Sequence, residues 1–220
     1  MSNKILTIDQ GTTSTRSILF NEKLDILEQY QCEYPLIYPK DGWVEIDPGV
    51  LLSSVNKTTS KFKDIPLSKV AITNQRETTI VWDRKTEQPI YNAIVWQDRR
   101  TSAYCDSIKS KEVEQLITSK TGLLLDPYFS ATKIRWILDN VDGALQKAKN
   151  GELCFGTVDT YLMFKLSNGK IFKTDYTNAS RTLLFNIKTL RWDQELLDLF
   201  DIPISMMPEA VPSDDNFGDI

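Results

Sequence analysis

The sequence predicts an α/β protein with a mixed sheet. Three apolar segments near the N-terminus, residues 4–8, 16–20 and 26–36, have the composition and length of consecutive strands. The first segment typical of a helix begins only after Asp47, and strand-like and helix-like segments mix from there on. Because strands that come first and then mix with helices are typical of this class, we expect a mixed sheet flanked by helices.

The N-terminal strands predict a meander rather than a strand–helix crossover. A polar segment at 9–15 joins the first strand to the second, and a turn at 21–25 joins the second to the third. Asp47 followed by Pro48 is typical of a helix start, because aspartate caps free N–H groups and proline fits the first helical turn. We therefore expect a helix from residue 48 to about residue 63.

A polar loop between two strands organises the next region. Residues 67–74 and 79–82 are rich in β-branched and apolar side chains, which favours strands. The loop between them has no Gly or Pro, the residues that favour tight turns, and it carries Arg76 beside Glu77. A further strand is predicted over 91–96.

The second half of the chain is predicted mainly as helices. These helices are expected at 101–109, 111–121, 130–140, 142–150, 159–166 and 193–200. Segment 174–181 is dense in small polar residues, so we expect a turn or loop at a sheet edge and assign it no role from its chemistry. Residues 202–218 are typical of a linker or of a strand that leads onward.

Composition indicates a globular protein and limits its partners. Of the 220 residues, 41% are hydrophobic and 25% are charged, and the net charge is -4. With no basic stripe, we expect no nucleic-acid partner. No apolar run approaches the roughly 18–20 residues that span a bilayer, so we expect no membrane partner. The acid at position 9 comes too early for a signal peptide.

Cysteine and histidine usage limits the chemistry. Cys32, Cys105 and Cys154 lie far apart and are odd in number, which predicts reduced thiols in a cytoplasm rather than a disulfide framework or a zinc site. The sequence contains no histidine. This excludes Ser-His-Asp and Cys-His catalysis. It also argues against a transition-metal site, because histidine is the commonest ligand of such metals. Carboxylates, Arg, Lys, hydroxyls or a hard cation held by oxygen must carry any chemistry.

The first candidate site is the polar segment 9–16. It lacks the known glycine-rich nucleotide patterns, but Gly11 is followed by a run of hydroxyl residues and then by Arg16. The hydroxyl residues nearest the glycine are Thr12, Thr13 and Ser14. Backbone N–H groups freed by Gly11, with these hydroxyls, would cradle a phosphate, and Asp9 would hold a hydrated Mg²⁺. An ordinary Thr/Ser-rich hairpin turn is the alternative.

The second candidate site is the adjacent pair Arg76 and Glu77. A guanidinium beside a carboxylate offers donors and acceptors to one small ligand and would discriminate strongly for hydroxyl groups. Trp96 and Tyr128 would supply apolar edges for the carbon chain of a polyol. The alternatives are an exposed ion pair on a hairpin and two aromatic side chains of the core.

Taken together, these stretches resemble the FGGY family of sugar and polyol kinases, and most closely its glycerol-phosphorylating branch. Residues 8–14 are similar to the opening phosphate motif of the family, 128–140 to its internal signature, and 74–79 to the substrate loop of the glycerol branch. Further matches lie at 42–45, 95–100, 156–160 and 175–182. The resemblance extends over essentially the whole chain.

The resemblance implies a fold and a reaction. It implies a ribonuclease-H-like, actin-type domain over residues 1–220, with a mixed five-stranded central sheet flanked by helices. The implied reaction transfers the γ-phosphoryl group of ATP to glycerol, with Mg²⁺, to give sn-glycerol 3-phosphate in cytoplasmic glycerol catabolism. The resemblance also implies a homo-oligomer in the intact protein.

The resemblance also assigns roles to residues of this sequence. The glycerol hydroxyls would bind to Arg76, Glu77 and Tyr128, and the glycerol carbons would lie against Trp96 and Phe129. The terminal phosphates of the nucleotide would contact Gly11, Thr12, Thr13, Ser14 and Arg16. Asp9 would lie near Mg²⁺.

One departure from the family pattern concerns the catalytic base. In the family this base is an aspartate of a later motif, and a second domain holds the adenine; we expect both beyond Ile220. Because phosphoryl transfer depends on positioning both substrates in line, we expect the 220 residues alone to bind glycerol weakly and not to turn it over. Two alternatives stay open. One is a kinase for another polyol or sugar, and the other is a non-catalytic polyol-binding module.

Overall fold

The computed structural model describes residues 3–219, which fall into two compact units. The first unit contains the described residues up to 37 together with 46–75. The second contains 38–45 and the described residues from 76 onward. The short strand β4 (Glu45–Ile46) spans one of the points at which the chain passes from one unit to the other.

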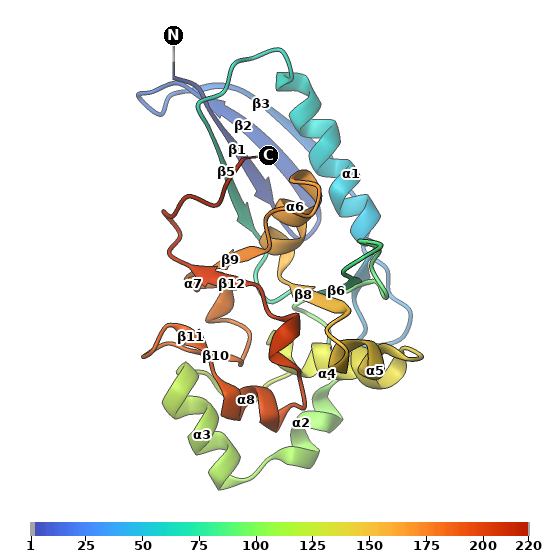
Figure 1. The fold of residues 1–220 in the computed structure, drawn as a ribbon. Coiled ribbons are helices and arrows are strands. Elements are labelled where there is room, and N and C mark those ends of the chain that lie inside the picture. Colours follow the sequence, from blue (N-terminus) through green and yellow to red (C-terminus); the bar gives the residue numbers. More distant parts are fainter. Residues whose placement is uncertain (1–2, 220) are drawn as a thin grey trace. The chain divides into compact units, whose positions relative to one another are not determined.

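The first unit is built on a mixed four-stranded sheet with the order β3-β2-β1-β5. Strands β1 (Ile5–Gln10), β2 (Ser14–Phe20) and β3 (Ile26–Glu33) form an antiparallel meander, and β5 (Lys69–Asn74) runs parallel to β1. Figure 1 shows these strands side by side. The predicted meander and the mixed character of the sheet are confirmed.

One face of this sheet is covered by helix α1 (Pro48–Thr59), which continues as the 3-10 turn η1 (Ser60–Phe62). Residues alternate along β1 and β2, so that every second side chain is buried. Hydroxyls join the helix to the sheet: Thr15 Oγ1 lies 2.6 Å from Ser54 Oγ, and Ser17 Oγ donates to Thr58 Oγ1 at 2.7 Å. The helix therefore has a fixed position on the sheet.

The start of α1 follows the predicted capping pattern. The Asp47 carboxylate accepts a hydrogen bond from the Gly49 N–H at 2.7 Å, and Pro48 occupies the first helical position.

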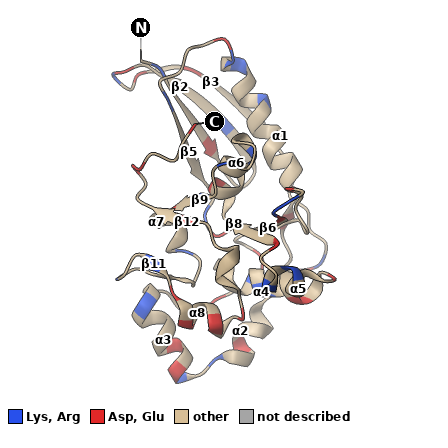
Figure 2. Ribbon diagram, viewed as in Figure 1, with Lys and Arg blue, Asp and Glu red and all other residues tan. Residues whose placement is uncertain are grey.

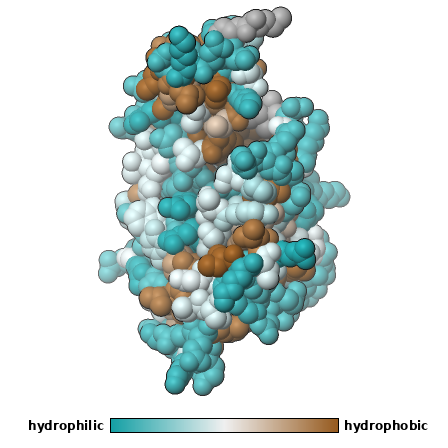
Figure 3. Space-filling view, turned by 90° about the vertical axis from the view of Figure 1, so that its left-hand side faces the viewer, coloured by the Kyte–Doolittle hydropathy of each residue, from teal (hydrophilic) through white to brown (hydrophobic). Residues whose placement is uncertain are grey.

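Some hydrophobic side chains on the strands of this unit are exposed to solvent. Ile26, which is exposed, lies opposite Phe20. Figure 3 shows hydrophobic residues gathered on a part of the surface.

The second unit combines small sheets with most of the helices. β6 (Ile80–Asp83) pairs antiparallel with β8 (Leu153–Gly156), β9 (Lys173–Asp175) pairs parallel with β12 (Glu209–Val211), and β10 (Phe185–Asn186) pairs antiparallel with β11 (Arg191–Trp192). β7 (Ala93–Ile94) is short. The helices are α2 (Ser102–Ile108), α3 (Lys111–Thr121), α4 (Ser130–Asn140), α5 (Ala144–Lys149), α6 (Val158–Leu166), α7 (Tyr176–Ala179), α8 (Gln194–Leu199) and η2 (Ile204–Met206).

Apolar packing and ion pairs hold these helices together. Side chains of α4, α5 and α8 share one buried cluster with β8, which includes Ile134, Phe155 and Leu196. Opposite charges connect α3 to the start of α8, where Lys120 Nζ lies 2.6 Å from Asp193 Oδ1 (Figure 2). Within residues 3–219, no helix is long and apolar enough to cross a membrane.

The predicted α/β class is confirmed, but three details are wrong. The largest sheet among the described residues has four strands rather than five, because β6 pairs with β8 in a separate ladder. The strand expected over 91–96 is reduced to β7. Segment 174–181 is not a loop: it contains the end of β9 and helix α7, whose start Asp175 caps by accepting from the Asn178 N–H at 2.8 Å.

The ladder of β6 and β8 carries an aromatic cluster around Trp82. The Trp82 ring is fully buried and contacts the rings of Tyr161, Phe164 and Phe172 at centroid distances of 5.5, 5.3 and 5.9 Å. Edge and tilted contacts of this kind stabilise a core beyond the area that they bury. The cluster therefore ties α6 to the ladder.

Replacing Gly156 by alanine is expected to lower the free energy of unfolding by about 1–3 kcal/mol, because the added methyl overpacks this cluster. A Cβ at Gly156 would lie 2.7 Å from Thr160 Cβ and 2.9 Å from Trp82 Cη2. Urea unfolding followed by circular dichroism measures the change. An unchanged midpoint would contradict the prediction and show that β8 can shift away from Trp82.

Candidate functional site

The first candidate site is the hairpin between β1 and β2. The Gly11 N–H donates to the Ser14 C=O at 2.9 Å, and the Tyr34 N–H donates to the Thr13 C=O at 3.1 Å. The N–H of Gly11 itself is therefore occupied within the hairpin. What the glycine supplies is a closed hairpin. Thr13 lies exposed at its tip.

The Gly11 carbonyl accepts hydrogen bonds from three side chains, none of which was a candidate site residue in the sequence. Gln10 Nε2 donates to this carbonyl at 2.7 Å, and Gln75 Nε2 donates to it at 3.1 Å. The Tyr34 hydroxyl also donates to it, and burial raises the pKa of this hydroxyl. Gln10, Gln75 and Tyr34 thus fix the hairpin to the edge of the sheet. Gln75 and Tyr34 reach Gly11 from distant positions in the sequence, so no local pattern marks them.

Asp9 and Arg16 lie opposite each other on neighbouring strands, on one face of the sheet. Their side chains form no ion pair in the described part of the chain. Arg16 Nη2 instead donates to Gln31 Oε1 at 3.3 Å, and Gln31 Nε2 donates to Ser14 Oγ at 3.2 Å. The Asp9 carboxylate is therefore uncommitted within residues 3–219.

The donor set around Asp9 fits one kind of metal ion. Mg²⁺ keeps several water ligands and often needs only one or two carboxylates, with phosphate oxygens as further ligands. Among the described residues, no group of three or more carboxylates or cysteines gathers to form a complete metal cage. A single free carboxylate beside a hydroxyl-rich hairpin suits a hydrated Mg²⁺ that arrives with a phosphate.

The second candidate site begins at Glu77, whose backbone φ is 64°. The Thr78 N–H donates to the Arg76 C=O at 2.8 Å and closes a three-residue turn around Glu77. Positive φ at a residue other than glycine is uncommon and is concentrated at functional sites. The turn sends the two side chains into different surroundings: Glu77 is buried and Arg76 is exposed.

The ion partner of Glu77 is Arg181, not the adjacent Arg76. Arg181 Nε lies 2.6 Å from Glu77 Oε1, across 104 positions of sequence. Within residues 3–219, the side chains of Arg76 and Glu77 do not bond to each other. Arg76 and Glu77 therefore do not form the exposed ion pair that was the alternative to a ligand-binding role. Arg181 lies just after α7, in the segment to which the sequence assigned no role.

Three aromatic side chains lie beside this ion pair, and we call Trp96, Tyr128 and Phe129 the aromatic wall. The Trp96 and Tyr128 rings are 5.5 Å apart, and the Tyr128 and Phe129 rings are 5.3 Å apart. The Arg181 guanidinium lies 4.9 Å from the Phe129 ring centre and 5.7 Å from that of Tyr128. The structure thus brings together every residue expected at this site except Arg76.

A buried lysine underlies the aromatic wall. Lys133, in the first turn of α4, is fully buried, and its ammonium donates to the C=O groups of Tyr128 and, at 3.3 Å, Phe129. Burial lowers the pKa of Lys133 to about 7, although the charges of Asp98 and Glu77 oppose the shift. Lys133 therefore fixes the backbone that carries two of the three rings.

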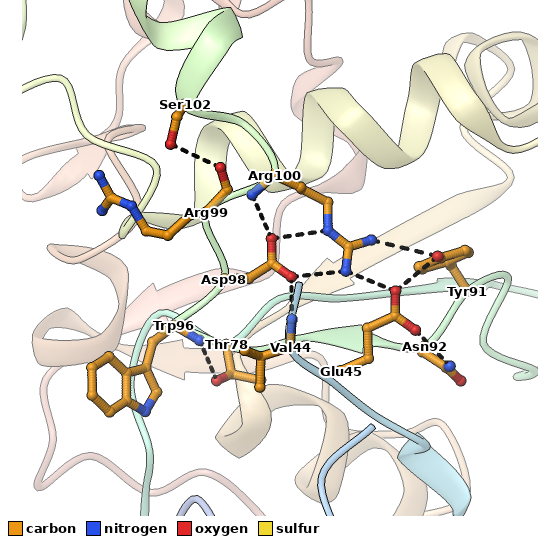
Figure 4. A network of polar contacts seen from close by, with 10 residues as sticks. All are labelled: Val44, Glu45, Thr78, Tyr91, Asn92, Trp96, Asp98, Arg99, Arg100 and Ser102. Carbon is orange, nitrogen blue, oxygen red and sulfur yellow. Dashed lines mark hydrogen bonds and ion pairs between the residues drawn. The ribbon is translucent and has the colours of Figure 1, made fainter. Parts of the chain in front are cut away.

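Trp96 is positioned by a buried ionic network around Arg100, whose side chain is 0% exposed (Figure 4). Arg100 Nη2 lies 2.8 Å from Asp98 Oδ2 and 2.7 Å from Glu45 Oε1. Tyr91 and Asn92 donate to the two oxygens of Glu45, each at 2.8 Å. Although burial alone lowers the pKa of Arg100, its bonds to Asp98 and Glu45 outweigh this effect and raise it.

This network fixes the turn that bears Trp96. The Asp98 N–H donates to the Val95 C=O at 3.0 Å, and Asp98 Oδ2 accepts from the Val44 N–H at 2.6 Å. The Trp96 N–H donates to Thr78 Oγ1 at 3.3 Å, which connects this turn to the residue after Glu77. Rigid support of this kind is what a binding site needs to hold its side chains in place.

The first unit carries a hydroxyl-rich hairpin on a meander-led mixed sheet, and the second carries a buried carboxylate beside an aromatic wall. The chain belongs to the FGGY family: residues 4–220 match the FGGY family of carbohydrate kinases, N-terminal domain. The chain has the actin-like fold of these kinases, which is also the fold of the solved structures that it resembles.

Relatives of known function match the whole chain. It is 58% identical to the glycerol kinase of Parabacteroides distasonis over 94% of its length, and 52% identical to that of Clostridium botulinum over 100%. Plasmodium falciparum glycerol kinase with ADP has a TM-score of 0.93 and 38% identity over 100% of the chain. The chain spans 42–45% of the length of these proteins.

Proposed function

We propose that this chain supplies the glycerol-binding side of an ATP-dependent glycerol kinase. The reaction transfers the γ-phosphoryl group of ATP to glycerol and gives sn-glycerol 3-phosphate. The observation that carries the proposal is the buried Glu77 carboxylate, which faces an aromatic wall in a chain similar to glycerol kinases along its length. A carboxylate with one free oxygen accepts a hydrogen bond from a hydroxyl group, and aromatic rings pack against carbon.

The roles within the proposed site follow from this chemistry. Glu77 accepts from a glycerol hydroxyl, and Arg76 and the Tyr128 hydroxyl supply donors. Trp96 and Phe129 pack against the carbons. These assignments are supported by the ring contacts among Trp96, Tyr128 and Phe129 and by Arg181, which bonds to Glu77 and lies over two of these rings. Arg76 is exposed and would reach the ligand from the solvent side.

We assign the nucleotide phosphates to the hairpin at 11–14 with Arg16. The hairpin is supported in this role by its fixed Gly11 carbonyl and its exposed Thr13. Asp9 would hold Mg²⁺ through water, and the ion would supply positive charge to the transferring phosphoryl group. The ADP in the similar Plasmodium falciparum structure supports a nucleotide as co-substrate.

The general base is proposed to lie outside the described residues. The buried carboxylates of this region, Glu77 and Asp98, are each already bonded to an arginine, at 2.6 and 2.8 Å. For the 220 residues alone, we therefore propose weak glycerol binding without turnover. Cytoplasmic location and a homo-oligomeric whole protein are further parts of the proposal and rest on the family resemblance.

Replacing Glu77 by glutamine is expected to weaken glycerol binding by about tenfold or more, because a charge-assisted hydrogen bond becomes a neutral one. Glycerol titration of the chain, followed by ligand-observed NMR, measures the affinity. Glu112→Gln, an exposed change on α3, is the matched control and should bind like the original chain. Equal affinity of the Glu77→Gln variant would contradict the proposed role of Glu77.

A second candidate substrate class is another polyol or a sugar. The chain is 26% identical to gluconate kinase and to xylulose kinase from Lactobacillus acidophilus, each with a TM-score of 0.85. Competition between glycerol, erythritol, xylulose and gluconate for the chain separates the two proposals. Tighter binding of any ligand other than glycerol would favour the second.

A further inference from the structure

We propose that Arg181 is a positioning residue that sets the specificity of the ligand site. It holds Glu77 by one carboxylate oxygen, so that the other oxygen is left for a ligand hydroxyl. This inference rests on the proposed function, because Glu77 is the residue proposed to bind that hydroxyl. It assigns a role to a side chain that neither the adjacent sequence nor the predicted Arg76–Glu77 pair indicates.

The geometry leaves two sets of polar atoms available. Arg181 Nε bonds to Glu77 Oε1 at 2.6 Å, but Oε2 accepts no hydrogen bond from any residue between 3 and 219. The two Nη groups of Arg181 likewise donate none to the described residues. The Glu77 side chain is 4% exposed and that of Arg181 is 29% exposed. One hydroxyl group could accept from an Nη and donate to Oε2.

Arg181 is itself held firmly in place. Its guanidinium lies over the rings of Phe129 and Tyr128, which restricts its side chain from one side. The backbone beside it is also attached, because the Ala131 N–H in the first turn of α4 donates to the Thr182 C=O at 2.9 Å. The guanidinium is therefore packed against two rings of the aromatic wall.

Among the described residues, Arg181 is the cation that bonds to the Glu77 carboxylate. The Glu77 C=O accepts from the hydroxyls of Ser130 and Thr79, each at 3.1 Å, so its backbone is fixed without Arg181. Lys133 attracts this carboxylate only at longer range, because its ammonium bonds to carbonyls. Removal of Arg181 would leave a buried charge unpaired, and such a side chain turns toward water.

The consequence for recognition is selectivity for a hydroxyl. A buried polar group that binds a ligand hydroxyl is left unpaired when the ligand lacks this hydroxyl. The resulting loss of affinity discriminates strongly against such a ligand. If Arg181 sets the direction of Oε2, then its removal should lower glycerol affinity and also erase the preference for glycerol over a ligand with one hydroxyl fewer. A purely structural role would reduce stability and keep the preference.

The test compares Arg181→Met, Arg181→Lys, Glu77→Gln and the double variant Arg181→Met/Glu77→Gln. Each binds glycerol, propane-1,2-diol and propane-1,3-diol in separate titrations, and urea unfolding of each variant shows whether it folds. Arg191→Met, which removes an exposed arginine of β11, is the matched control.

We expect Arg181→Met to weaken glycerol binding by about tenfold and to bind glycerol no better than the diol that the original chain rejects most. Arg181→Lys should recover part of the affinity, because an ammonium can donate to Oε1 but lacks the planar fork. The double variant should bind like Glu77→Gln, because coupled residues are not additive. Additive losses or an unchanged preference in a folded Arg181→Met variant would overturn the inference alone. Failure of the original chain to bind glycerol would instead overturn the proposed function, and the inference with it.

Discussion

Replacing Arg100 by methionine is expected to lower the free energy of unfolding by about 3–5 kcal/mol, the usual loss when one partner of a buried ion pair is removed. Arg100 lies between two carboxylates, Asp98 and Glu45, that are 1% and 2% exposed. Without the guanidinium, both would be buried close together with no cation bonded to them. Methionine keeps much of the apolar stem, so the loss of charge pairing dominates the effect.

Arg99→Met is the matched control, because the neighbouring arginine makes an exposed ion pair. Arg99 Nη1 lies 2.9 Å from Asp126 Oδ1, and its side chain is 53% exposed. An exposed pair of this kind contributes about 0–1 kcal/mol. Urea unfolding of both variants measures the difference. Similar losses for the two arginines would show that the buried network adds no more stability than a surface pair.

The unfolding free energy of the chain is expected to rise with pH above about 7 because of Lys133, and this rise should disappear in Lys133→Met. The folded chain lowers the pKa of Lys133 to about 7, from 10.5 in the unfolded chain. Between these two values the unfolded chain binds more protons, so raising the pH favours the folded chain, with a slope of at most about 1.4 kcal/mol per pH unit. Below about pH 7 both states carry the proton, and this lysine adds no pH dependence.

The comparison that isolates Lys133 is the difference between the original chain and the variant at each pH, since other groups titrate in both. Lys111→Met, at the exposed start of α3, is the control and should follow the original profile. Urea unfolding at intervals between pH 6 and about pH 10 measures the slopes. Parallel profiles for the original chain and Lys133→Met would show that Lys133 keeps its charge when buried.

Helices with strong local signals could be predicted to the residue. The predicted range 111–121 coincides with α3, where the Ser110 hydroxyl accepts from the Val113 N–H at 3.2 Å and Gly122 ends the helix with φ 72°. The range 130–140 coincides with α4. Capping groups act within four residues, so the sequence alone specifies the ends of α3.

The pairing of the strands was harder to predict, because strands that pair can be distant in the sequence. The meander was predicted because its connections are short, whereas the five-stranded sheet was wrong. β6 pairs with β8, more than 60 positions away, and β8 is a four-residue apolar segment that gives no clear local signal. Which strands pair depends on how apolar faces pack in the whole unit rather than on the composition of each strand.

By itself, the sequence determined the family, the α/β class and the residues of the aromatic wall, because these depend on motifs and local periodicity. Only the tertiary structure decided that Glu77 pairs with Arg181. Adjacent side chains on a tight turn face different surroundings, and the positive φ of Glu77 buries its carboxylate while Arg76 stays in water. A buried carboxylate needs a counter-charge, and here the fold supplies it from 104 positions away.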